Sequence, residues 1–122
     1  MSMTTGTAAD TATGIGYLTL SVADLERAMA FYGALFGWSF EHVSETSAHV
    51  ANTALPMGLV AQGAADLRFL YFRVEDVAAM AAKVTALGGR VLDRGEYPSG
   101  PNAICADPDG TIFSLWQPAE GY

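Results

Sequence analysis

Apolar and polar residues alternate at the start of the stretch from Tyr17 to Gly37, and apolar residues then recur at helical spacing. The alternation has the period of a strand with one apolar face, and it predicts a strand over residues 15–22. Asp24 stands where a helix N-cap belongs, because its carboxylate can accept the free N–H groups of the first turn. The apolar stripe that follows predicts a helix over residues 24–36. Gly37 can take the left-handed conformation that ends a helix.

The same order of signals returns in the second half of the chain, where a predicted strand over residues 69–74 leads into a predicted helix over residues 77–87. Three positions have counterparts 52 residues later, and the pairs are Val22 and Val74, Asp24 and Asp76, and Gly37 and Gly89. We interpret the two stretches as copies of one supersecondary unit. The alternative is two unrelated strand–helix pairs with similar corners.

Three short alternating segments follow each predicted helix, so each half reads β-α-β-β-β and the fold class is α+β. The predicted strands cover residues 38–43, 48–51, 57–62, 90–95, 102–106 and 111–117. The expected organisation is a disordered tail (1–14), a first module (15–62), a linker (63–68), a second module (69–118) and a C-terminal tail (119–122). Because the linker is short for a boundary between independent domains, the modules should pack on each other or on a partner's modules.

The face of the predicted strands that points away from the helices mixes aromatic, hydroxyl and charged groups. Its members are Tyr17, Thr19, Ser21, Phe69, Tyr71, Arg73, Ile112, Ser114 and Trp116. Such a mixture suits a concave ligand-binding surface better than a sealed core. The loop from Tyr97 to Asn102 carries two prolines and a glycine, and it could close over that surface or merely turn the chain.

Composition narrows the classes of function. The 122 residues carry a formal net charge of −7, which argues against nucleic acid as a partner because phosphates require a basic surface. No apolar run approaches the roughly 20 residues of a membrane helix, so we expect no membrane partner. The N-terminal residues lack the basic start and apolar segment of a signal peptide. The lone cysteine, Cys105, excludes an internal disulfide and fits a reducing cytoplasm, with the thiol buried.

The chain resembles the vicinal oxygen chelate superfamily, which contains glyoxalases, bleomycin-resistance proteins and extradiol dioxygenases. The resemblance runs from about Tyr17 to Pro118. It rests on L-S-V-A-D-L-E-R-A-M-A-F-Y-G-A-L-F-G-W, on V-E-D-V-A-A-M-A-A-K-V-T-A-L-G-G and on A-D-P-D-G-T-I-F-S-L-W-Q-P. It implies tandem βαβββ modules that form curved mixed sheets around a cleft, and a homodimer. The closing F-S-L-W-Q-P resembles a subgroup of small glyoxalase-like bacterial proteins.

The resemblance also implies four metal-ligand positions in the members that use a metal. Here Tyr17 and Phe69 stand where the two halves would supply their first ligands, Ser114 replaces the usual glutamate, and the fourth position falls near Gly58. A divalent ion needs several converging imidazole or carboxylate ligands. We therefore expect no metal and no cofactor at this site. The alternative is a metal enzyme with relocated ligands that include His42 and His49.

Several side chains remain candidates for contact with a ligand. The expected ligand-binding set is Tyr17, Thr19, Trp38, His49, Phe69, Tyr71, Arg73, Ser114 and Trp116. Their rings could wall an aromatic pocket, or they could only fill the space of a lost metal site. His49 could be a general base or a structural residue. Arg73 could anchor a ligand carboxylate, or it could pair with Glu75 or Asp76.

The leading hypothesis is therefore a metal-free protein that binds a small aromatic or cationic molecule and sequesters an antibiotic or metabolite. The second hypothesis is a metal-free isomerase, lyase or cyclase that uses Tyr17, Tyr71 or His49 for proton transfer. The third is a lyase or dioxygenase that depends on a divalent metal. Whether the protein is an enzyme stays open at this point.

Overall fold

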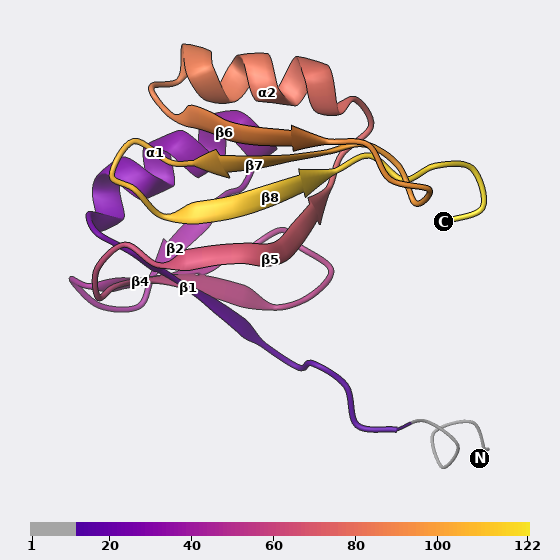
Figure 1. Ribbon diagram of the computed structural model, residues 1–122. Coiled ribbons are helices and arrows are strands. Elements are labelled where there is room, and N and C mark those ends of the chain that lie inside the picture. Colours follow the sequence, from indigo (N-terminus) through magenta and orange to yellow (C-terminus); the bar gives the residue numbers. More distant parts are fainter. Residues whose placement is uncertain (1–11) are drawn as a thin grey trace.

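The computed structural model describes residues 12–122, so most of the predicted N-terminal tail lies outside the described residues. The first module contains β1 (Leu18–Val22), α1 (Leu25–Phe36), β2 (Phe40–His42), β3 (Ser47–Val50) and β4 (Met57–Ala61). The second contains β5 (Asp66–Arg73), α2 (Val77–Ala86), β6 (Arg90–Gly95), β7 (Asn102–Ala106) and β8 (Ile112–Trp116). Figure 1 shows this order along the chain. No helix within residues 12–122 is long and apolar enough to cross a membrane.

Each module forms its own four-stranded mixed sheet, as the repeat predicts. The strand orders are β1-β4-β3-β2 and β5-β8-β7-β6. The pairs β1–β4 and β5–β8 are parallel, and the other neighbours are antiparallel. The α+β class and the tandem βαβββ plan are thus confirmed.

The predicted helix caps are also confirmed. The side chains of Asp24 and Asp76 accept hydrogen bonds from the backbone N–H groups of Arg27 and Ala79, at 2.8 and 3.0 Å. Gly37 ends α1 with a left-handed φ of 74°. The repeat predicts that Gly89 ends α2 as Gly37 ends α1. This prediction is wrong by one residue, because it is Gly88 that follows the helix with a positive φ of 92°. Gly89 is needed for a different reason, because a Cβ there would lie 2.5 Å from the carbonyl oxygen of Ala106.

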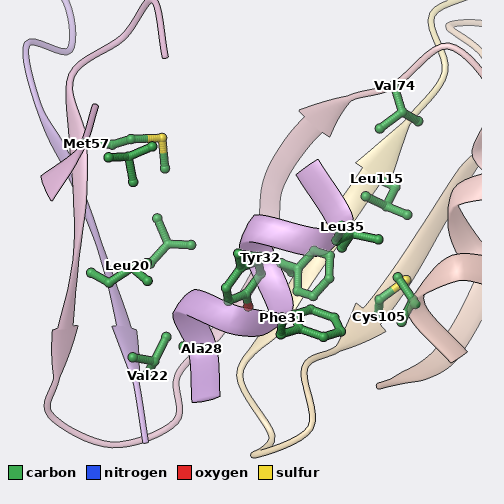
Figure 2. Packing of buried hydrophobic residues seen from close by; sticks show 14 of the residues in the cluster. Leu20, Val22, Ala28, Phe31, Tyr32, Leu35, Met57, Val74, Cys105 and Leu115 are labelled. Atoms are coloured by element: carbon green, nitrogen blue, oxygen red, sulfur yellow. The ribbon is translucent and has the colours of Figure 1, made fainter. Parts of the chain in front are cut away.

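Helix α2 covers one face of the second sheet (Figure 1), and α1 lies between the two sheets (Figure 2). Figure 2 shows Leu20 and Met57 of the first sheet on one side of α1 and Leu115 of the second sheet on the other. Tyr32 of α1 packs edge-on against Phe113 of β8, with ring centroids 5.5 Å apart. One apolar core therefore joins the two modules.

The boundaries of two strands differ from the prediction in ways that affect the site. Strand β1 begins at Leu18, so Tyr17 precedes it. Strand β5 begins at Asp66, inside the predicted linker, and its register with β8 shifts between Leu67 and Tyr71. A β-bulge of this kind leaves extra residues unpaired and redirects their side chains. Alternation alone could not reveal it, because the exposed and half-buried residues from Phe69 to Arg73 alternate without interruption through the shift.

Candidate functional site

A hollow of about 810 Å³ opens at one end of the second sheet, and we call it the aromatic hollow. Its lining comes from β5, β7 and β8, from the loop before β7 and from the C-terminal segment. The lining residues are Tyr71, Tyr97, Pro98, Ser99, Gly100, Asn102, Trp116 and Tyr122. Four of these eight carry aromatic rings, and none carries an acidic or basic side chain. The hollow can therefore offer a large flat contact area without charge.

The loop before β7 is held against the end of β8 by several hydrogen bonds. The indole Nε1–H of Trp116 donates to the Ser99 carbonyl oxygen at 3.0 Å. The backbone N–H of Ala119 donates to the same oxygen at 2.8 Å, and that of Gln117 donates to the Pro101 carbonyl oxygen at 3.0 Å. These bonds fix the orientation of the Trp116 ring, which forms a wall of the hollow.

A row of paired residues crosses the second sheet, and two of its members, Trp116 and Asn102, line the hollow. Trp116 pairs with Arg73 on one side and with Asn102 on the other, and Asn102 pairs in turn with Gly95. Gly95 makes room for its neighbours, because a Cβ there would lie 2.6 Å from both the Asn102 Oδ1 atom and the Tyr97 ring. The missing side chain thus lets the amide of Asn102 and the ring of Tyr97 occupy this corner.

Arg73 lies beside the aromatic hollow and not in its lining. Its guanidinium carbon stands 5.8 Å from the centroid of the Trp116 ring, which is a cation–π distance. The side chain borders a second hollow of about 560 Å³ that also contains Glu75 and Glu120. Within residues 12–122 Arg73 forms no ion pair, so of the two alternatives left open for it, pairing with Glu75 or Asp76 does not occur. Asp76 caps α2 instead.

A second cluster of candidate residues lies on the first sheet. The hydroxyl of Tyr17 is 3.1 Å from the Nδ1 atom of His49, and the two rings stack with centroids 5.9 Å apart. Gly58 leaves space for this contact, because a Cβ there would lie 2.7 Å from the Tyr17 hydroxyl oxygen. Thr19 lies opposite Gly58 in β1 and is exposed. The structure thus supplies the partner for His49 that the sequence could not identify.

The positions that the resemblance assigns to metal ligands do not fit a metal ion. Tyr17 is hydrogen-bonded to His49, and Gly58 has no side chain. The Phe69 side chain is 83% exposed at the bulge of β5. Ser114 is fully buried, and its hydroxyl donates to the carbonyl oxygen of Arg68. In the described part of the chain, no three His, Cys, Asp or Glu side chains gather in a way that could hold a metal ion.

The structure therefore divides the expected ligand-binding set. Tyr71 and Trp116 line the aromatic hollow and Arg73 borders it, whereas Tyr17, Thr19 and His49 lie on the first sheet. Trp38 does not join either group, because it packs among the rings of Tyr32, Phe36 and Phe72 in the core.

Six lining residues were not in the expected ligand-binding set: Tyr97, Pro98, Ser99, Gly100, Asn102 and Tyr122. The proline- and glycine-rich loop was the only local sign of the first five. Their arrangement depends on hydrogen bonds between this loop and residues 117–119, which are distant in sequence. Tyr122 lies in the predicted C-terminal tail, where no pattern marks a contact.

The buried Cys105 does not belong to either cluster. It is inaccessible to solvent, and burial raises the pKa of its thiol to about 11. The thiol is therefore protonated near neutral pH and unsuited to act as a nucleophile. This confirms the expectation of a buried cysteine.

Comparison with known proteins connects this geometry to a family. A family model described as a glyoxalase-like domain matches residues 17–116. The structure of TnmS3, an antibiotic binding protein from Streptomyces sp. CB03234, is similar with a TM-score of 0.67 and 27% identity over 88% of this chain and 98% of that one. The fosfomycin resistance protein FosX from Listeria monocytogenes has a TM-score of 0.71 at 20% identity, over 90% of this chain and 94% of that one. At that identity the likeness to FosX shows the fold alone.

A shorter match connects the chain to a mycobacterial protein. Over 52 residues it is 46% identical to "Putative glyoxylase CFP32" of Mycobacterium bovis. This match covers 41% of this chain and 20% of that protein. The chain thus spans about a fifth of the length of the curated relative.

Proposed function

This chain belongs to the glyoxalase-like domain family, and we propose that it binds a planar aromatic small molecule in the aromatic hollow and sequesters it without a metal ion. The observation that carries the proposal is the gathering of Tyr71, Tyr97, Trp116 and Tyr122 around one open space. The two tyrosines at its rim are strongly exposed, Tyr97 by 60% and Tyr122 by 61%. Large rings left in water around a hollow are typical of a binding site.

Sequestration is favoured over catalysis at this hollow by the chemistry of its lining. The lining contains no histidine, carboxylate, thiol or amine, which are the side chains that most often act as general acids or bases. The family resemblance to TnmS3, described as an antibiotic binding protein, supports the same choice. An antibiotic or aromatic metabolite is thus the proposed class of ligand. A homodimer, with twice the chain mass of 12.8 kDa, and a cytoplasmic location belong to the same proposal.

A thermal-shift screen against planar aromatic natural products tests this function, followed by calorimetric titration of each hit. We expect at least one compound to raise the melting temperature of the wild-type protein. Trp116→Leu should abolish the shift, since the ring that forms a wall of the hollow is lost. Tyr17→Phe is the matched control, because Tyr17 lies on the other sheet, and it should keep the shift. No stabilisation by any planar aromatic compound would contradict the proposal.

The contact between Tyr17 and His49 supports a second candidate function, proton transfer to or from a small metabolite. Histidine is the side chain that most often acts as a general acid or base, and a hydrogen-bonded tyrosine can hold its ring in one orientation. An isomerase or lyase assay with candidate substrates would test it. Activity that survives in Tyr17→Phe and in His49→Gln would rule out this pair as the catalytic group.

A further inference from the structure

We propose that the aromatic hollow selects neutral planar ligands that carry an amide, lactam or imide group, and that Asn102 recognises this group. The inference rests on the proposed function, because it assigns the chemical class of the ligand at the same hollow. It also assigns a specificity residue that the sequence did not single out. Three observations carry it: the burial of Asn102, its position, and the absence of charge around it.

Among the buried polar residues of the described chain, Asn102 differs from the others in that its side chain has no hydrogen-bond partner. Asp107, Thr111 and Ser114 are all buried, and each side chain forms at least one hydrogen bond. The Asn102 side chain is only 9% exposed, and within residues 12–122 it forms none. A buried amide without a partner is costly and therefore rare, so one that persists at the wall of a hollow indicates a group kept for a ligand.

The position of Asn102 restricts the shape of that ligand. Asn102 is the strand neighbour of Trp116, its Oδ1 atom shares the space above Gly95 with the Tyr97 ring, and all three side chains line the hollow. An amide beside two aromatic rings of the lining meets the edge of a flat molecule lying against those rings. The ligand therefore presents its polar group at its rim, in the plane of its rings.

The chemistry of the side chain restricts the polar group. An amide has both a donor and an acceptor, and a ligand amide or lactam offers the complementary pair. Two hydrogen bonds of this kind satisfy both partners without any charge. A ligand carboxylate only accepts hydrogen bonds, so it could pair with the NH₂ group of Asn102 but would leave its C=O group without a donor.

The charges near the hollow favour a neutral ligand. The lining contains no charged side chain, so an ionised ligand would lose its hydration without compensation. Arg73 already places a cation against the Trp116 ring, which disfavours a second cation at the same ring. Glu75 and Glu120 share the neighbouring hollow with Arg73 and offset its attraction for an anion. The competing possibility, an aromatic carboxylate held by Arg73, is an outcome of the test.

The test compares four naphthalenes substituted at the same ring carbon: the carboxamide, the carboxylate, the aminomethyl cation and the methyl compound. Calorimetric titration of the wild-type protein should give the carboxamide the highest affinity, by about fivefold over the methyl compound. A carboxylate that binds more tightly than the carboxamide would overturn the inference and leave the proposed function intact. Failure of all four compounds to bind would contradict both the inference and the proposed function.

Two variants test whether the preference for the carboxamide depends on the side chain of Asn102. Asn102→Leu keeps a similar volume without hydrogen bonds, and it should lower the affinity for the carboxamide about fivefold while the methyl compound changes less than about twofold. Its melting temperature should equal or exceed that of the wild type, because an unpartnered polar group is removed. Arg73→Gln, the matched control, should leave the carboxamide affinity unchanged. Equal losses for both compounds in Asn102→Leu, or a lower melting temperature, would show that Asn102 has a structural role only.

Discussion

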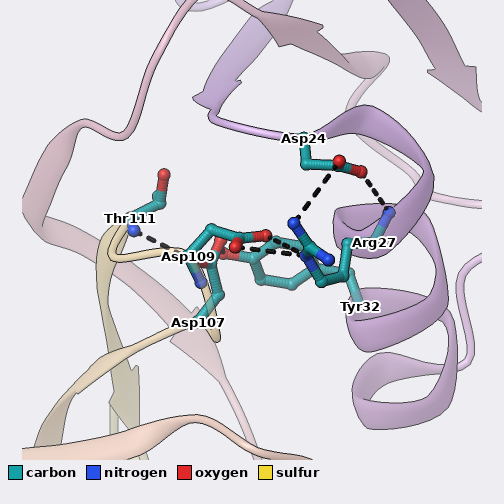
Figure 3. A network of polar contacts seen from close by, with 6 residues as sticks. All are labelled: Asp24, Arg27, Tyr32, Asp107, Asp109 and Thr111. Atoms are coloured by element: carbon teal, nitrogen blue, oxygen red, sulfur yellow. Dashed lines mark hydrogen bonds and ion pairs between the residues drawn. The ribbon is translucent and has the colours of Figure 1, made fainter.

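The hydroxyl of Tyr32 on α1 donates a hydrogen bond to the buried Oδ2 atom of Asp107 in the β7–β8 turn, across 3.0 Å. The Oδ1 atom of the same carboxylate accepts from the backbone N–H groups of Asp109 and Thr111. On the surface of the same turn, Arg27 of α1 forms an ion pair with Asp109 at 2.8 Å (Figure 3). The helix of the first module is thereby fastened to the hairpin of the second, and the two sheets keep one relative position.

Tyr32→Phe should lower the free energy of unfolding by about 2 kcal/mol. The substitution keeps the ring packing but leaves one oxygen of a buried carboxylate without a partner. Urea titration measures the change. Tyr97→Phe is the matched control, because its hydroxyl is exposed, and it should change the stability by less than about 0.5 kcal/mol. A Tyr32→Phe protein as stable as the wild type would contradict the role of this hydrogen bond.

Stability should fall as the pH rises above about 9. Burial raises the pKa of Cys105 to about 11, and burial together with Asp107 raises the pKa of Tyr32. A group with a raised pKa keeps its proton longer in the folded state. Its contribution is therefore complete below the pKa of the unfolded chain and is lost as the pH rises towards the folded value. For Cys105 alone the loss by pH 10.5 is about 2 kcal/mol.

Urea titrations under reducing conditions at pH 8 and pH 10.5 measure how much the free energy of unfolding falls as the pH rises. Cys105→Ala removes one of the two groups, so its stability should depend less on pH than that of the wild type, whatever its absolute stability. Identical slopes for the two proteins would show that Cys105 ionises equally in both states.

Gly100→Ala should destabilise the protein by more than about 2 kcal/mol. Its φ of 124° is unfavourable for alanine, and the added Cβ would collide with the backbone carbonyl of Gln117. Gly63 has a φ of 99° with nothing within 4 Å of an added Cβ, so Gly63→Ala isolates the cost of the conformation. Thermal unfolding compares the two. Equal losses of stability in Gly100→Ala and Gly63→Ala would mean that the loop can move away from residue 117 at little cost.

Gly95→Ala should weaken the binding of any ligand of the aromatic hollow at least about tenfold. The new Cβ takes the space of the Asn102 amide and the Tyr97 ring, and both must shift into the hollow. Gly16→Ala, where an added Cβ meets nothing within 4 Å, should keep the wild-type affinity. Calorimetric titration with the naphthalene carboxamide measures both, and wild-type affinity in Gly95→Ala would exclude this corner from the site.

The fold could be predicted from sequence because its signals are local and occur twice. Asp24 and Asp76 begin helices by contacts within one turn, and the alternating strands need only their own pattern. Phe69 shows where such reasoning fails. Its alternation with Tyr71 and Arg73 is correct, but Phe69 lies within a register shift that no local pattern marks, and it is 83% exposed and outside the lining of the hollow.

The site could be predicted only where it coincides with a strand. Tyr71 and Trp116 follow from strand faces, whereas Asn102, Ser99 and Tyr97 are placed by a loop whose hydrogen bonds reach the C-terminal segment. The apolar position of Tyr32 is also evident from helical spacing. The bond from its hydroxyl to Asp107 is not, since it joins residues 75 positions apart.

The two tryptophans allow the central claim to be tested inside one molecule. The Trp116 indole lines the aromatic hollow and donates to Ser99, whereas Trp38 packs among core rings. In a ¹H–¹⁵N spectrum titrated with the naphthalene carboxamide, with peaks assigned by Trp116→Phe, the Trp116 indole signal should move and saturate. The Trp38 signal should stay in place. Saturable binding that leaves the Trp116 signal unmoved would contradict the aromatic hollow as the binding site.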